Sequence, residues 1–130
     1  MKKYIYISLI LVFSFSVSYG QGMKESINSA FSKSNIALLE TQLSSTVYLD
    51  IEDSDGNFSL NQAKVILQEF IHNNPQKSFK INHEGKSDDG AKYIIATYES
   101  THKSYRVYFL IGGKGKSPKI LQIEIEELLD

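Results

Sequence analysis

Cysteine is absent from all 130 residues of this chain, and its absence narrows the chemistry that the chain can perform. Without a thiol there is no disulfide, no thiolate nucleophile and no cysteine ligand for a metal. The three histidines, His72, His83 and His102, are scattered along the sequence. The sequence therefore predicts no zinc site.

An excess of charge of either sign is also missing, with 14 basic against 15 acidic residues and a formal net charge of −1. Such a chain does not attract polyanions in bulk, so nucleic acid is not an expected partner. The glycine-rich segment 112–116 opens no helix and so lacks the backbone amides of a phosphate site. No Ser–His–Asp pattern is visible, and we predict no catalytic residue set and no cofactor.

A long hydrophobic run occurs only at the N-terminus, where Lys2 and Lys3 precede an apolar stretch from Tyr4 to Val17. Small residues follow at Ser18 and Gly20, which predicts a signal peptide over residues 1–20 and a single α+β domain over residues 21–130. The competing interpretation is a membrane anchor, but a spanning helix needs about 20 apolar residues. We therefore expect export to the periplasm or the extracellular space, without membrane insertion after cleavage.

Short helical and strand patterns fill the segment after this leader. Residues 23–31 place their apolar side chains on one helical face, and Asn35 can cap a second short helix over residues 36–43. Residues 47–51 alternate between apolar and polar side chains, as in a half-buried strand.

The cluster from Asp53 to Asn57 has the composition of a turn and faintly resembles a calcium-binding loop. Counted from Asp53, such a loop needs glycine at its sixth position and glutamate at its twelfth. Those positions hold Phe58 and Lys64. We predict a solvated turn and no metal.

Residues 59–73 have the clearest helical pattern of the chain. Ser59 and Gln62 can form a capping box, in which each side chain satisfies the other's free backbone N–H. An unbroken apolar stripe follows, formed by Ala63, Ile66, Leu67, Phe70 and Ile71.

Residues 78–128 read as four antiparallel strands joined by polar turns. A two-residue turn at His102-Lys103 would pair Tyr98 with Val107 and Glu99 with Arg106. One face is then almost wholly apolar and is expected to pack against the helices. Its predicted members are Phe79, Ile81, His83, Ile94, Ala96, Tyr98, Tyr105, Val107, Phe109, Ile111, Leu121, Ile123 and Ile125.

On the opposite face Ile95, Tyr108 and Leu110 form an apolar patch. The open face of a sheet normally carries polar residues instead. Its expected rim is Glu99, Arg106, Glu124 and Glu126, with Arg106 in a ladder of ion pairs. Such a patch predicts a partner surface, and a two-fold homodimer is the simplest partner. The alternative is ordinary surface with scattered aromatic residues.

Four segments together resemble a known family: KSFKINHEG at 77–85, AKYII at 91–95, YRVYF at 105–109 and LQIEIE at 121–126. The family consists of small exported bacterial proteins of unknown function and is similar to the nuclear-transport-factor-2-like (cystatin-like) superfamily. The resemblance implies a cone, in which a curved antiparallel sheet wraps around the long helix, often dimeric through its outer face. The implied order is helix–helix–strand–helix followed by four strands. Enzymes and plain scaffolds share this fold, so the resemblance implies no chemistry.

His83 is the one histidine that the predicted register places on the apolar face, which suggests a ligand contact or a pocket acid/base. A histidine at the rim of the sheet, beside Gly85, is the alternative. Our first hypothesis is an exported, non-enzymatic homodimeric module that binds a small apolar ligand or another protein. The second is a cavity enzyme of isomerase or dehydratase type that uses His83 for proton transfer.

Overall fold

The computed structural model describes residues 19–112 and 117–129, and it confirms the predicted α+β class with a curved sheet. Its elements are α1 (Tyr19–Ser32), the 3₁₀ helix η2 (Ile36–Leu39), β1 (Leu43–Ile51), β2 (Ser54–Ser59), α2 (Leu60–Asn73), β3 (Gln76–Lys86), β4 (Lys92–Ser100), β5 (Ser104–Gly112) and β6 (Lys119–Leu128). The predicted leader lies outside the described residues, apart from its last two. Of the described helices, none has the length and apolarity to span a membrane.

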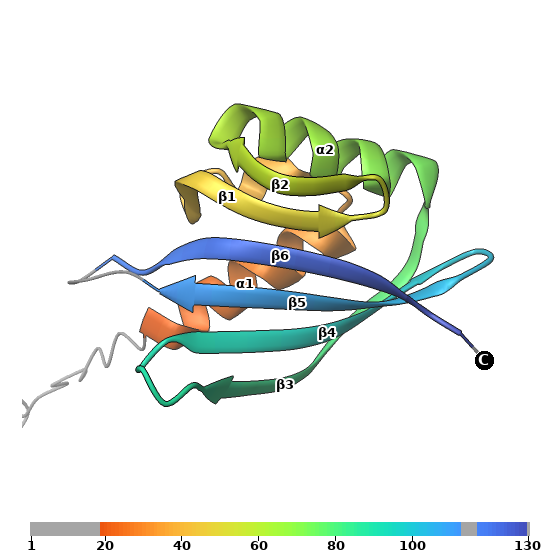
Figure 1. Cartoon of the computed structure of the whole chain (residues 1–130). Coiled ribbons are helices and arrows are strands. Elements are labelled where there is room, and N and C mark those ends of the chain that lie inside the picture. The colour runs from red at the N-terminus through yellow and green to blue at the C-terminus, as the bar shows by residue number, and fades with distance from the viewer. Residues whose placement is uncertain (1–18, 113–116, 130) are drawn as a thin grey trace, which may run out of the picture.

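The six strands form one sheet in the order β2-β1-β6-β5-β4-β3. All neighbouring strands are antiparallel except β1 and β6, which are parallel. Figure 1 shows α1 crossing behind the sheet, while α2 lies along its β2–β1 end. We call the side of the sheet that faces α1 the inner face and the opposite side the outer face.

Of the three predicted helix starts, the second and third are confirmed by their caps, whereas α1 begins four residues before the predicted Met23. The Asn35 side chain accepts a hydrogen bond from the Ala37 amide at the start of η2. The Ser59 hydroxyl accepts from the Gln62 amide, and the Gln62 side chain accepts in return from the Ser59 amide. Each such cap contributes about 1 kcal/mol, so these two positions fix where the helices begin.

The core forms between the inner face and the helices, as the apolar pattern predicts. Phe31 of α1 stacks on Phe79 of β3 at a centroid distance of 4.8 Å and meets Phe109 of β5 edge-on at 5.7 Å. Phe70 of α2 meets Tyr105 of β5 edge-on at 5.0 Å. Offset and edge-on geometries of this kind are the favourable ones for aromatic rings. Both helices are thereby fixed to the same face of the sheet.

The β4–β5 hairpin is paired two residues away from the predicted register. Tyr98 lies opposite Tyr105, not Val107, and Glu99 lies opposite Ser104. The turn residues are Thr101 and His102, because Ser100 and Lys103 close the hairpin through backbone and side-chain hydrogen bonds. A shift of two residues leaves every side chain on its predicted face, so the two faces are confirmed although the partners are wrong.

The face predicted for one residue of β6 is wrong. Leu121 is 36% exposed, whereas Ile120 is fully buried in its place. The β5–β6 pairing shifts between Leu110 and Ile111, which pair with Gln122 and Ile120. This bulge inserts one extra residue into β6 and turns Leu121 outward, over Gly112.

The predicted turn at residues 53–57 is mostly a strand. Only Glu52 and Asp53 form the turn, with Glu52 at φ 50°, and β2 then pairs with β1 from Ser54 to Ser59. The predicted order of elements therefore lacks one strand. Leu43 also belongs to β1 and not to the second helix, which ends at Leu39.

Candidate functional site

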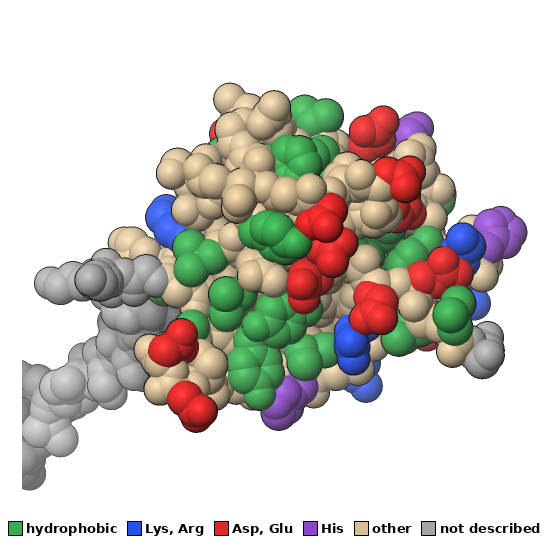
Figure 2. Space-filling view, viewed as in Figure 1, with side chains coloured by type: hydrophobic (Ala, Val, Ile, Leu, Met, Phe, Trp, Pro, Cys, Tyr) green, Lys and Arg blue, Asp and Glu red, His purple; other side chains and the backbone are tan. Residues whose placement is uncertain are grey.

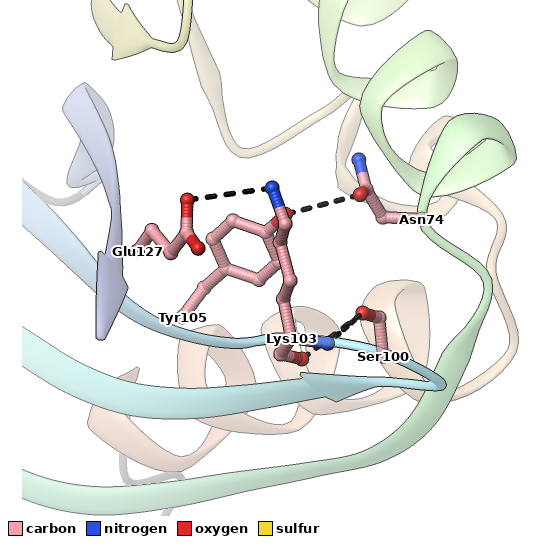
Figure 3. A network of polar contacts seen from close by, with 5 residues as sticks. All are labelled: Asn74, Ser100, Lys103, Tyr105 and Glu127. Carbon is pink, nitrogen blue, oxygen red and sulfur yellow. Dashed lines mark hydrogen bonds and ion pairs between the residues drawn. The ribbon is translucent and has the colours of Figure 1, made fainter. Parts of the chain in front are cut away.

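The inner face is filled by aromatic side chains whose polar groups are already paired. The Tyr98 hydroxyl donates to the Asn74 carbonyl oxygen at 2.5 Å, and the Tyr105 hydroxyl donates to Asn74 Oδ1 at 3.0 Å. Burial raises the pKa of Tyr98 to about 12. Figure 3 shows Tyr105 reaching Asn74 at the end of α2, with Lys103 paired to Glu127 nearby. These two tyrosines serve as structural anchors of α2.

His83 lies on the outer face, so the prediction that it faces the apolar interior is wrong. Ile81 pairs with the inner residue Ala96, but His83 pairs with the outer residue Ile95, and Asn82 is the extra residue of a bulge between them. The Asn82 amide donates to Thr97 Oγ1 at 3.1 Å. His83 is exposed, with its Nε2 3.3 Å from the Tyr93 hydroxyl oxygen. It is therefore not a base inside a closed cavity.

The three residues predicted for the outer apolar surface do lie together. Ile95 of β4 is directly opposite Tyr108 of β5, and Leu110 is opposite Tyr93 in the next outward row. Tyr93 and Tyr108 stack with centroids 6.3 Å apart and planes 21° apart. We call these four half-buried residues, Tyr93, Ile95, Tyr108 and Leu110, the outer patch.

Tyr93 is the member of the outer patch that is not predicted from the sequence. Its position has the same parity as Ile95, so continuing the alternation by one step would have found it. It is held in place by Gly85 on β3, where a Cβ atom would lie only 2.6 Å from Tyr93 Cζ. The glycine thus provides the space that the Tyr93 ring occupies.

A depression of about 240 Å³ opens at the outer patch, lined by Ile95, Arg106, Tyr108, Glu124 and Glu126. Arg106 Nη2 lies 2.8 Å from Glu126 Oε2, which confirms that half of the predicted ion-pair ladder. The other half is wrong, because Arg106 faces Thr97 and Glu99 accepts a hydrogen bond from Ser78. Burial, and then the nearby Glu124 carboxylate, raise the pKa of Tyr108 above its ordinary value.

Carboxylates continue the row of Tyr108 across the sheet. Glu124 of β6 lies opposite Tyr108, Asp50 of β1 opposite Glu124, and Asp55 of β2 opposite Asp50. We call Glu124, Asp50 and Asp55 the acidic row. Figure 2 shows acidic side chains over β6 and β1 beside hydrophobic ones over β5 and β4. A polar side and an apolar side thus meet on one open face.

One tyrosine at the far end of the acidic row is bound to it. The Tyr48 hydroxyl donates to Asp55 Oδ1 at 2.5 Å. This hydrogen bond, then desolvation, and then the charges of Asp55, Asp50 and Glu124 raise the pKa of Tyr48 to about 12. Within residues 19–112 and 117–129, no three histidine or carboxylate side chains are grouped so that they could hold a metal ion.

Comparison with known proteins gives a family without an assigned activity. Residues 24–126 match the model of a family described as "Domain of unknown function (DUF4783)". No functionally curated protein matches the chain.

Solved structures agree with that match. A DUF4783 family protein from Bacteroides fragilis YCH46 is 27% identical at a TM-score of 0.72, over 79% of this chain and 96% of that one. One from Bacteroides ovatus ATCC 8483 is 25% identical at 0.73, over 81% and 94%. An NTF2-like protein of unknown function from Shewanella baltica OS155 shares 9% identity at 0.64, over 88% and 98%. The last shows similarity of fold alone.

Proposed function

Because this chain belongs to the DUF4783 family and has an NTF2-like fold, whose members carry no chemistry in common, we propose that it is a non-enzymatic binding module that acts through its outer sheet face. One observation supports this most: two stacked tyrosines, an isoleucine and a leucine lie together on an open face, and two of them, Ile95 and Tyr108, line a depression of about 240 Å³. An apolar patch with a charged rim is typical of a partner surface.

The shape of the depression favours a protein over a small apolar ligand. Pockets that enclose small molecules usually have volumes of about 300–1,000 Å³ and bury most of the ligand surface. The depression here is smaller and lies open on the face of a sheet, where Arg106, Glu124 and Glu126 form part of its wall. A side chain from another protein fits such a hollow better than a free apolar molecule does.

The competing enzyme hypothesis depended on His83 inside a closed cavity. The bulge at Asn82 turns His83 to the outer face, and the interior between α1 and the sheet holds the rings of Phe31, Phe79 and Phe109 in contact. His83 therefore cannot transfer a proton in that interior. His83 remains a candidate contact residue at the edge of the outer patch.

Export is a further part of the proposal. The apolar run after Lys2 and Lys3 supports export through a signal peptide over residues 1–20. A homodimer, with a second copy of the chain over the outer patch, is the simplest alternative to a different partner protein.

Photo-crosslinking in the cells that produce the protein tests this function. A photoreactive residue replaces Tyr108 in the outer patch, and in a matched variant it replaces Val65, which is 64% exposed on α2. We expect a cross-linked protein, either a second copy or another chain, at position 108 and not at position 65. Equal cross-linking at the two positions, or none at 108, would contradict the proposal.

A further inference from the structure

The outer face carries more acidic than basic residues, and the two kinds lie on different parts of it. By strand pairing, the outward acidic residues are Glu99, Glu124, Glu126, Asp50 and Asp55, and the outward basic residues are Lys80, Arg106 and Lys119. The acidic row lies beside the outer patch on β6, β1 and β2. Lys80 and Arg106 lie on β3 and β5, and Lys119 lies at the start of β6, where its amine donates to the Thr41 carbonyl oxygen. A partner that covers the outer patch from the β6 side therefore meets negative charge.

The acidic row is not neutralised by the described part of the chain. The ion pairs found there join Lys64 to Glu40, Lys103 to Glu127 and Arg106 to Glu126, and none of them reaches Glu124 or Asp50. Asp55 is bound only by the Tyr48 hydroxyl, which adds no positive charge. The strands that carry these carboxylates lie about 5 Å apart, and like charges directly opposite each other on neighbouring strands are destabilising. A cation brought by a partner would relieve this repulsion.

A second copy of the chain is a poor source of that cation. A two-fold axis through the outer patch places the same face on both sides of the contact. The face carries more acidic than basic groups, and its Arg106 is already bound to Glu126. Such a dimer would bring two negative faces together. The charge balance instead favours a partner of opposite charge.

We propose that the outer face docks a basic segment of a different protein, with an apolar side chain in the depression between Ile95 and Tyr108 and Lys or Arg side chains over the acidic row. This inference rests on the proposed function and specifies the partner's chemistry. The adjacency is direct, since Tyr108 and Glu124 are opposite residues on neighbouring strands. A Lys or Arg residue matches this surface well, because its aliphatic stem packs on tyrosine while its charge reaches the carboxylates.

Titration with a model peptide tests the inference. The probe is a fluorescein-labelled amphipathic peptide of Leu and Lys, and its counterpart carries Glu in place of every Lys. We expect the Lys peptide to bind the full chain and the Glu peptide not to bind. Removing two charges of the acidic row, with Asp50→Asn and Glu124→Gln, should weaken binding about tenfold. Binding should also weaken as salt is added.

The matched control is Glu25→Gln with Glu69→Gln, which removes two carboxylates from exposed positions on α1 and α2. We expect this control to bind the Lys peptide within about twofold of the unchanged protein, since it alters net charge but not the outer face. Equal weakening in both double variants, or no binding of the Lys peptide, would overturn the inference.

The outcome for the proposed function is read separately. If Tyr108 cross-links in cells but the captured protein is a second copy, the outer face is a binding surface and the basic-partner inference fails. If position 108 cross-links to nothing, the proposed function itself fails, whatever the peptide does. Capture of a different protein, at a contact that Asp50→Asn with Glu124→Gln abolishes, would support both.

Discussion

The Tyr93 ring lies directly over Gly85, across the β3–β4 pair, in a space that a single methyl group would fill. The same ring stacks on Tyr108, so a backbone feature of β3 determines how the outer patch is built on β4 and β5. Aromatic rings that cover a cross-strand glycine in this way stabilise the pairing and fix the ring orientation.

Gly85→Ala tests this relationship. The new Cβ would lie 2.5 Å from the Tyr93 hydroxyl oxygen, so the ring must move away from Tyr108. We expect a loss of about 1 kcal/mol in the free energy of unfolding, measured by urea denaturation. Gly22→Ala is the control, because its Cβ would meet nothing within 4 Å, and it should leave stability unchanged or slightly higher. A neutral Gly85→Ala would show that the Tyr93 position is not fixed by this contact.

Asn74 joins the end of α2 to two buried tyrosines, which predicts a specific coupling. Asn74→Ala removes the Oδ1 acceptor of the Tyr105 hydroxyl and should cost about 1–3 kcal/mol, since a partly buried hydroxyl is left unpaired. Tyr105→Phe in the same chain removes that hydroxyl, so the double variant should lose less than the sum of the two single variants. A double-mutant cycle by denaturant unfolding measures this, and simple additivity would contradict the assigned contact.

Alkaline pH should destabilise the fold through its tyrosines. The pKa of Tyr98 is raised to about 12 by burial, and that of Tyr48 to about 12 by its hydrogen bond to Asp55. A raised pKa in the folded state means that folding favours the protonated hydroxyl, so this stability is complete below pH 10 and is lost as pH rises from 10 to 12. Urea unfolding across that interval should show a falling free energy, and Tyr98→Phe should make the fall shallower. A flat profile would contradict the raised pKa values.

The N-terminal sequence predicts a processed protein. Cleavage before Gln21 would remove Lys2, Lys3 and the whole apolar run, leaving a formal net charge of −3. Mass spectrometry of the protein from its own cells should find an N-terminus at Gln21. A retained Met1 together with a membrane-bound chain would instead support the anchor interpretation.

The division of the sheet into two faces could be predicted because side chains alternate between the faces every second residue. An error of two residues in the strand register therefore leaves each side chain on its face. Tyr98 and Val107 were assigned as partners wrongly, yet both are buried on the inner face as predicted. The helix starts were equally accessible, since Asn35 and Ser59 act through contacts only two and three residues away. Helix caps and the alternation of apolar and polar residues can therefore be recognised from the sequence alone.

Bulges and β2 could not be predicted on the same basis. One inserted residue reverses the alternation after it, which moved His83 and Leu121 to faces opposite to those expected. β2 has the sequence SDGNFS, with turn-forming residues and one apolar side chain, Phe58, so its strand conformation depends on pairing with β1. Both the bulges and β2 depend on pairing between strands, and this pairing leaves no pattern in the sequence of a single strand.

The central claim is that this protein binds through its outer face and not through its interior. Because the chain has no cysteine, a single introduced cysteine is its only thiol and can be labelled selectively. A single cysteine replaces Leu110 in the outer patch, and in a matched variant it replaces the exposed Val65 of α2. The rate of maleimide labelling is then compared between purified protein and intact cells. We predict that labelling at position 110, relative to position 65, is slower in cells, where the partner covers the outer patch. The same ratio in both settings would contradict the account.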